Sequence, residues 1–125
     1  YEDKLKWLDD KMDFAFKLVP DNWTVIVTSD HGLTDSGQHG SDEMIIRETA
    51  GFMWGPNVAK GVVVEGMDQR DLATLPSMIL GLPFPHAVVG KIPLDAFELT
   101  DQQYRTYEQW NWNAAVERNG FSVRL

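Results

Sequence analysis

An aspartate and two histidines lie close together in one short, turn-rich stretch of the sequence. Residues 29–40 read SDHGLTDSGQHG and contain Asp30, His31 and His39. Neutral imidazole and carboxylate oxygen are common ligands of zinc and related divalent metals, and catalytic metal sites keep one position open for water or substrate. The types and spacing of these three side chains therefore predict a metal site.

The same residues also have a purely structural interpretation. Asp30 could accept backbone N–H bonds in an ordinary turn, and His31 could be a surface residue. A second His-Gly pair in the same loop has little structural reason to recur, so it favours the metal site. The third histidine, His86, lies in a proline-rich part of the sequence and is predicted to be a loop residue.

A strand must position this loop. Residues 24–28 read TVIVT, and such a β-branched, largely apolar run predicts a strand that is buried on both faces, as in a parallel sheet. Ligands gather just beyond the carboxyl ends of such strands, where Asp30 and His31 fall. Residues 2–18 have apolar side chains at three- and four-residue steps and predict an amphipathic helix before the strand. Helix and strand together form half of a βαβ unit.

Further elements are expected along the rest of the chain. They are a strand at 50–55, a brief strand at 62–64, a helix over 72–80, a closing helix over 101–118 and a short strand at 121–125. Asp68 or Asp71 is expected to cap the middle helix, and Gly81 to end it. Pro76 either lies in the first turn of a helix that begins near Thr74 or kinks the helix.

Composition limits the classes of partner. The chain has 125 residues with a net charge of −8, which argues against nucleic-acid binding because that function needs a basic patch. It contains no cysteine, so neither a disulfide nor a thiolate site is expected within it. No apolar run approaches the roughly 18 residues of a membrane-spanning helix.

Residues 29–40 resemble the signature of the alkaline-phosphatase superfamily, and most closely that of the ethanolamine phosphate transferases that modify glycosylphosphatidylinositol (GPI) anchors. The pattern of that family is Ser-Asp-His-Gly-Met-Thr/Ser-Asp-x-Gly-Ser-His-Gly, with Leu33 here in place of Met and Gln38 in place of Ser. Residues 69–72, 80–85 and 89–93 resemble further segments of the family in the same order. The resemblance covers most of residues 1–95.

The resemblance implies a fold and a metal-dependent mechanism. The fold would be α/β, part of an alkaline-phosphatase-like three-layer sandwich with a largely parallel central sheet, and residues 1–125 would be the C-terminal portion of that domain. The site would hold two divalent metal ions, zinc or alternatively manganese, for phosphoryl transfer. Asp30 and His31 would bind the metal on the side of the nucleophile, and His39 would bind the other metal.

The family's nucleophile and its remaining ligands are not matched in this sequence. The family has an Asp-x-x-x-His pair before the loop, but Asp9, Asp10 and Asp13 have no histidine four residues later. The upstream half of the same domain is therefore an expected partner, and this chain alone is expected to be inactive.

Substrates and location are also implied by the resemblance. The substrates would be a phosphoethanolamine donor and a lipid-linked glycan, in the lumen of the endoplasmic reticulum, with membrane attachment only through parts outside this chain. One alternative is a hydrolase of the nucleotide pyrophosphatase/phosphodiesterase type, whose second histidine usually lies much farther from Asp-His-Gly than His39 does. The other alternative is a non-catalytic interaction fragment.

Overall fold

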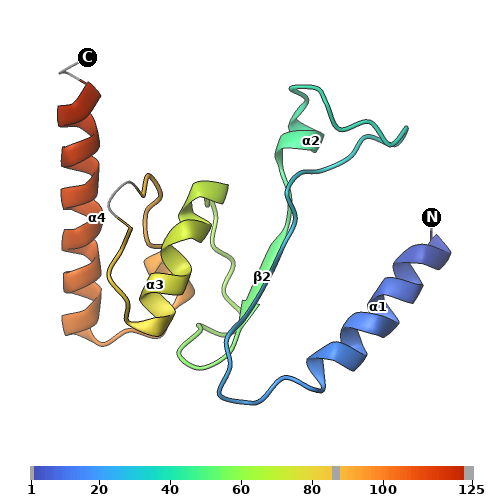
Figure 1. Cartoon of the computed structure of the whole chain (residues 1–125), viewed down its shortest axis with the longest axis horizontal. Coiled ribbons are helices and arrows are strands. Elements are labelled where there is room, and N and C mark those ends of the chain that lie inside the picture. The colour runs from blue at the N-terminus through green and yellow to red at the C-terminus, as the bar shows by residue number, and fades with distance from the viewer. Residues whose placement is uncertain (1, 86–87, 123–125) are drawn as a thin grey trace. The chain divides into compact units, whose positions relative to one another are not determined.

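The computed structural model describes residues 2–85 and 88–122, and the side chains among them as far as residue 117. The chain divides into two compact units, Tyr1–Pro56 and Asn57–Leu125, each described below by itself. His86, predicted to be a loop residue, lies outside the described residues. The first unit contains α1 (Glu2–Phe16), β1 (Val25–Thr28), α2 (Met44–Arg47) and β2 (Gly51–Trp54) (Figure 1). The second contains the 3₁₀ helices η1 (Gln69–Thr74) and η2 (Leu94–Ala96) and the α-helices α3 (Leu75–Leu80) and α4 (Asp101–Ser122).

The two strands of the first unit form an antiparallel pair. Val25 lies opposite Trp54 and Thr28 lies opposite Gly51, so the chain reverses direction between β1 and β2. Residues 29–43, which form the histidine loop, and α2 make this reversal at one end of the pair (Figure 1). The predicted mixture of helices and strands is confirmed. The strand pair itself is antiparallel rather than parallel, and the wider parallel sheet and the three-layer sandwich stay predictions.

The prediction that the first strand is buried on both faces is wrong. Along β1 the side chains alternate between half-buried and exposed, with Val25 and Val27 on the better covered face. This alternation is typical of an antiparallel pair that is covered on one side only. Phe16 at the end of α1 meets the edge of Trp54, with ring centroids 4.7 Å apart, and so the helix reaches this pair of strands.

The first helix is formed as predicted and ends before Pro20, but it has no buried residue. Its apolar side chains remain largely exposed, with Trp7 59% and Phe14 64% accessible. Ile46 in α2, 4% exposed, is the only apolar side chain that is buried among the described residues 2–56.

The second unit has a core of its own. Its buried apolar side chains come from the loop after β2, from α3 and from the segment around η2, and they are Val58, Leu75, Met78, Ile92, Ala96 and Phe97. Leu75 and Ile92 are each only 1% exposed. An isolated antiparallel bridge between Val58 and Phe97 joins the beginning of this unit to the segment after η2.

Capping residues begin and end the helical segment in the middle of this unit. The Asp68 carboxylate accepts the Arg70 backbone N–H at 2.8 Å, while the Asp71 carboxylate accepts the Asp68 backbone N–H at 2.9 Å. Both predicted caps therefore serve η1, and α3 follows directly with Pro76 in its first turn. Gly81 ends α3 in the left-handed conformation, at a φ of 64°, as predicted.

Two expectations for the second unit are wrong. Residues 62–64 form no strand, because they lie in a turn-rich loop between Gly61 and Gly66, both of which have positive φ. The closing helix α4 runs to Ser122 rather than ending at residue 118, so residues 121 and 122 are helical and not part of the expected strand at 121–125; residues 123–125 lie outside the described part. None of the helices within the described ranges is both long and apolar enough to cross a membrane.

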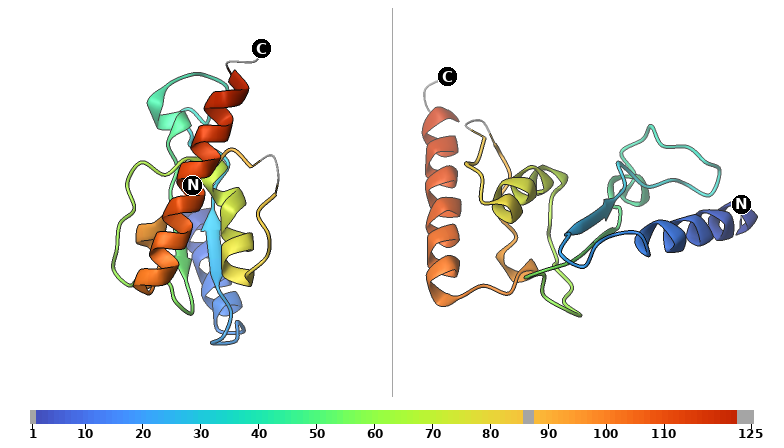
Figure 2. Two further views of the ribbon diagram at one scale, coloured as in Figure 1. Left: turned by 90° about the vertical axis from the view of Figure 1, so that its left-hand side faces the viewer. Right: turned by 60° about the horizontal axis from the view of Figure 1, so that its bottom comes forward.

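A side-chain amide attaches α4 to the core. Asn111 accepts the Ile92 backbone N–H through its Oδ1 atom at 2.7 Å and donates from Nδ2 to the Ile92 carbonyl at 3.0 Å. The ring of Trp110 packs against Phe84 with centroids 4.1 Å apart. Figure 2 shows α4 from two further directions, beside the segment that leads to η2. Trp110 thus serves packing, whereas Tyr104 and Trp112 on the same helix are 42% and 67% exposed.

Candidate metal centre

The histidine loop joins β1 to α2 and is fastened to α2 at its base. The Gly32 backbone N–H donates to the Ile46 carbonyl at 2.8 Å. A Cβ atom at position 32 would overlap the Ile45 carbonyl oxygen and crowd that of Glu48, so only glycine lets the backbone approach α2 this closely. Because Ile46 is buried, this contact gives the loop a fixed starting point directly after His31.

A tight turn over residues 34–38 returns the chain toward its starting point. The Thr34 backbone N–H donates to the Gln38 carbonyl at 3.0 Å, and the Gly37 N–H donates to the Thr34 carbonyl at 2.8 Å. The Thr34 hydroxyl oxygen accepts the Gln38 N–H at 3.0 Å. Gly37 has a φ of 79°, a left-handed conformation that glycine adopts without strain. The turn brings His39 back beside His31.

The structure places the three predicted ligands side by side. The imidazole rings of His31 and His39 are stacked, with centroids 4.9 Å apart and planes inclined by only 3°. His31 Nε2 lies 3.4 Å from Asp30 Oδ2. His31 therefore lies next to both Asp30 and His39. The role of these three side chains as metal ligands stays a prediction.

The hydrogen bond of His31 Nδ1 determines whether the other ring nitrogen, Nε2, has a lone pair available for a metal ion. His31 Nδ1 lies 2.9 Å from the Gly32 carbonyl oxygen, which can only accept, so we assign the ring proton to Nδ1. In the neutral ring, Nε2 then carries a lone pair and faces the Asp30 carboxylate. Two electron-rich atoms at this distance repel each other unless a proton on Nε2 or a metal cation lies between them. A backbone bond that fixes the tautomer in this way is typical of metal-binding histidines.

The Asp30 carboxylate is kept in its charged form. The His31 backbone N–H donates to Asp30 Oδ1 at 2.9 Å, and this bond, together with the Ser29 hydroxyl at 3.3 Å, lowers the pKa of Asp30 from its ordinary value. The side chain is 82% exposed, so the carboxylate can be reached from solvent. Asp30 is thus suited to be an anionic ligand at neutral pH.

The parallel orientation of the His31 and His39 rings bears on whether they could bind the same metal ion. A ring nitrogen binds a metal in the plane of its ring, and two stacked, nearly parallel planes do not meet near the rings. His31 and His39 therefore suit two neighbouring ions better than a single ion between them. Within residues 2–85 and 88–122, no three His, Cys, Asp or Glu side chains are grouped so that they could hold one ion.

The polar residues that follow His39 form local pairs near α2. The Ser41 hydroxyl donates to the Glu43 carboxylate at 2.9 Å, and Asp42 lies 3.6 Å from Arg47. Ser41, Asp42 and Glu43 are all exposed. The role of Thr34 was not predicted, although a threonine before a Ser-Gly turn is a recognisable signal of side-chain bonding to the backbone.

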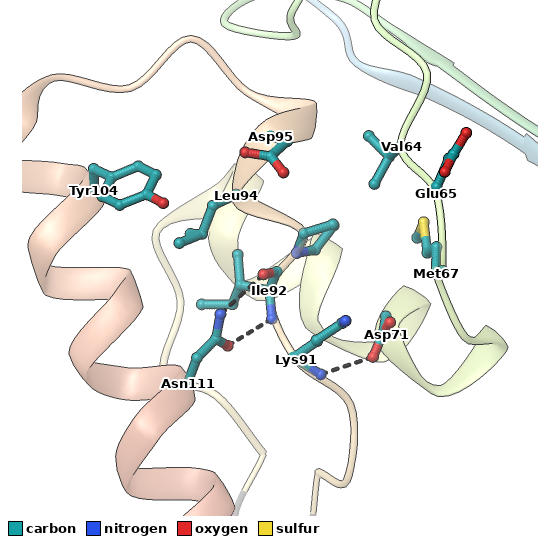
Figure 3. A pocket seen from close by; sticks show the side chains of 12 residues that line it. Val64, Glu65, Met67, Asp71, Lys91, Ile92, Leu94, Asp95, Tyr104 and Asn111 are labelled. Atoms are coloured by element: carbon teal, nitrogen blue, oxygen red, sulfur yellow. Dashed lines mark hydrogen bonds between the residues drawn. The ribbon is translucent and has the colours of Figure 1, made fainter.

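The second unit contains a cavity of about 200 Å³ (Figure 3). Its most buried polar wall is the Asp71 carboxylate, which accepts the Lys91 backbone N–H at 2.8 Å, while the amide of Asn111 is engaged with Ile92. Tyr104 and Asp95 line its outer part. The buried polar groups of this cavity hold backbone segments together, and the cavity has no counterpart among the features predicted from the sequence.

The chain is similar in sequence to a set of curated transferases. GPI ethanolamine phosphate transferase 1 of Homo sapiens is 31% identical over 62% of the chain, and the protein of the same name from Neurospora crassa is 33% identical over 55%. GPI ethanolamine phosphate transferase 3, catalytic subunit, of Homo sapiens is 26% identical over 75% of the chain. The aligned parts amount to 10%, 9% and 9% of these relatives, so the chain spans about a tenth of their length. No family model matches the chain, and no solved structure matches it significantly.

Proposed function

Because the chain resembles the GPI ethanolamine phosphate transferases, as its histidine loop predicted, we propose that it forms part of a metal-dependent phosphoethanolamine transferase that acts on GPI-anchor precursors. One observation of the structure carries the proposal. The loop after β1 places Asp30, His31 and His39 side by side, with His31 Nε2 facing Asp30 Oδ2 at 3.4 Å. A metal cation can lie between two such electron-rich atoms and bind both.

The three side chains divide between two ions in this proposal. Asp30 and His31 hold the ion on the side of the nucleophile, and His39 holds the second, which agrees with the parallel ring planes. Zinc suits imidazole and carboxylate ligands, and manganese is the alternative. When bound, such a pair of cations stabilises negative charge on the attacking and leaving oxygens of a phosphoryl transfer.

The rest of the proposed enzyme lies outside these 125 residues. The nucleophile and the remaining ligands would come from the upstream half of the same domain, and this chain alone would not catalyse transfer. The substrates would be a phosphoethanolamine donor and a lipid-linked glycan acceptor. The domain would face the lumen of the endoplasmic reticulum as part of a membrane protein.

The experiment compares two histidine variants in the complete protein that carries these residues. His39→Ala is expected to abolish transfer and to remove about one of two zinc ions measured by elemental analysis, because one ion loses a ligand. His86→Ala is the matched control, since it removes an imidazole outside the motif and should leave both readouts unchanged. Unaltered transfer by His39→Ala, or a complete protein without metal, would refute the proposal.

The isolated chain provides a second test. Three ligands divided between two ions hold neither tightly, so zinc is expected to bind residues 1–125 weakly and below one ion per chain. A tight and fully occupied zinc site in this chain would show that the proposed division of ligands is wrong.

A further inference from the structure

We propose that the Thr34 hydroxyl is a positioning group that holds the His39 imidazole against His31 before any metal binds. The inference rests on the proposed function in so far as His39 serves as a ligand there. Thr34 does not touch the proposed ions in this scheme. It acts through the turn that carries His39.

The Thr34 side chain adds bonds of its own to the backbone bonds that close this turn. Its hydroxyl oxygen accepts the Gln38 backbone N–H at 3.0 Å and lies 3.3 Å from the Gln38 carbonyl, to which it can donate. It also lies 3.0 Å from the Ser36 hydroxyl. Gln38 directly precedes His39, so one side chain fixes the peptide unit from which the second histidine projects.

Burial cannot supply this restraint. Thr34 is half-buried, whereas residues 35–45 are all exposed, and the next buried side chain is Ile46. A segment without buried apolar surface is ordered mainly by its polar bonds, since no hydrophobic contact opposes its conformational entropy. The close stacking of the two rings therefore depends on the hydrogen bonds across residues 34–38.

Fixing the ring in advance affects metal binding. A ligand that is already in place loses little conformational freedom when the ion binds, whereas a mobile ligand must be ordered at that moment. Groups that orient a metal ligand typically change metal affinity by about 10-fold to 100-fold when removed. Losing the Thr34 hydroxyl should weaken the proposed site by an amount in this range.

The first test observes the rings without metal. Thr34→Val keeps the branched shape of the side chain but removes the oxygen, so the Gln38 N–H loses its acceptor. In NMR spectra of the metal-free chain at one fixed pH, the ring-current shifts that the stacked imidazoles of His31 and His39 impose on each other should disappear. Thr34→Ser restores the hydroxyl and should restore these shifts.

Thr106→Val is the matched control. Thr106 donates its hydroxyl to the Gln102 carbonyl within α4 at 2.8 Å, so its replacement removes a comparable local bond far along the chain from the loop. The imidazole resonances of this variant should remain as in the unmodified chain. Amide signals of β1 and α2 in the Thr34 variants, and of α3 and α4 in Thr106→Val, report whether the altered unit is still folded.

The second test measures zinc affinity in the complete protein. Thr34→Val should bind zinc about 10-fold to 100-fold more weakly, and Thr34→Ser should bind close to normally. If Thr34→Val keeps the ring-current shifts, or if Thr34→Ser loses them as fully as valine does, the positioning role is wrong. If the unmodified complete protein binds no zinc, the proposed function fails, while the metal-free spectra still decide the role of Thr34.

Discussion

Each of the two units of the chain is stabilised internally in a different way. Residues 57–117 bury several apolar side chains and three polar ones, Asp71, Thr74 and Ser77. Among the described residues of the first unit, Ile46 alone is a buried apolar side chain. The unit that carries the possible chemistry thus has almost no core, and the unit with a core carries none of the predicted ligands.

Two aspartates show what this difference means for side-chain roles. Asp71 is 3% exposed, and both of its carboxylate oxygens accept backbone N–H bonds, one from Asp68 and one from Lys91. Asp30 also accepts a backbone N–H, but its side chain is 82% exposed. A buried and fully bonded carboxylate fixes the backbone, whereas an exposed one at the end of a strand can still receive a ligand.

Removing apolar volume from each unit tests the comparison most strongly. Leu75→Ala should lower the free energy of unfolding of the second unit by about 3 kcal/mol, because Leu75 is 1% exposed and its truncation leaves a cavity. Ile46→Ala should lower that of the first unit by about 1 kcal/mol, since few buried neighbours surround it. Hydrogen exchange of amides in α3 and α2 measures each unit separately. Equal losses would show that the first unit has a core comparable with the second.

The buried carboxylate should give the next largest effect. Asp71→Asn keeps the size of the side chain but replaces one accepting oxygen by an NH₂ group, so one of two backbone N–H groups loses its partner. The expected loss for the second unit is about 2 kcal/mol, seen as faster exchange of the α3 amides. Asp95→Asn, at an exposed position of the same cavity, is the control and should change little. Similar exchange rates in both variants would contradict a structural role for Asp71.

The attachment of α4 should contribute less. Asn111→Ala removes both bonds to the Ile92 backbone, and the expected loss is about 1.5 kcal/mol because this edge of the core is partly accessible to water. Gln109→Ala removes an exposed bond to Asn113 on the same helix and is the matched control. Urea unfolding, followed through the backbone amide signals of α4, measures the loss of stability in Asn111→Ala and in Gln109→Ala. A control as damaging as Asn111→Ala would mean that helix propensity, rather than the amide contacts, explains the loss.

The sequence predicts local structure best where one residue determines the backbone. Asp68, Asp71 and Gly81 were expected to cap or end their helix and do so, because these residue types satisfy particular backbone groups. The grouping of Asp30 with His31 also follows from adjacency in sequence. The position of His39 could only be hypothesised, because it depends on a turn to which a side chain five residues away, Thr34, contributes.

Burial and pairing direction could not be obtained from the sequence. The run from Val25 to Thr28 is β-branched and mostly apolar in both a doubly covered and a singly covered strand, so its composition does not reveal how many faces are covered. The antiparallel partner β2 also depends on how the connecting loop turns. Likewise, the closing helix was expected to end at residue 118, but α4 continues through Gly120 to Ser122, because an isolated glycine inside a helix is tolerated at a modest energetic cost.

The smallest expected effect concerns an exposed ion pair at the start of η1 and its dependence on pH. The Arg70 guanidinium donates to both Asp68 oxygens at 2.7 Å, and this bond together with the Arg70 backbone N–H holds the pKa of Asp68 well below its ordinary value. A carboxyl whose folded pKa is depressed stabilises the fold above its unfolded pKa of about 4, and this contribution is lost as the pH falls through the lower, folded pKa. Stability of the second unit should therefore decline below about pH 4 more steeply in the unmodified chain than in Asp68→Asn.

The difference between the two slopes should be small and should shrink in high salt, because both side chains are largely exposed and water screens their charges. Asp42→Asn is the control, since Asp42 pairs with Arg47 at 3.6 Å in the first unit and should leave the α3 amides unaffected at every pH. Identical acid slopes for the unmodified chain and Asp68→Asn would mean that the pair forms without stabilising η1. Stability of the second unit would then rest on its buried carboxylate and apolar core, which would sharpen its contrast with the loop that carries the histidines.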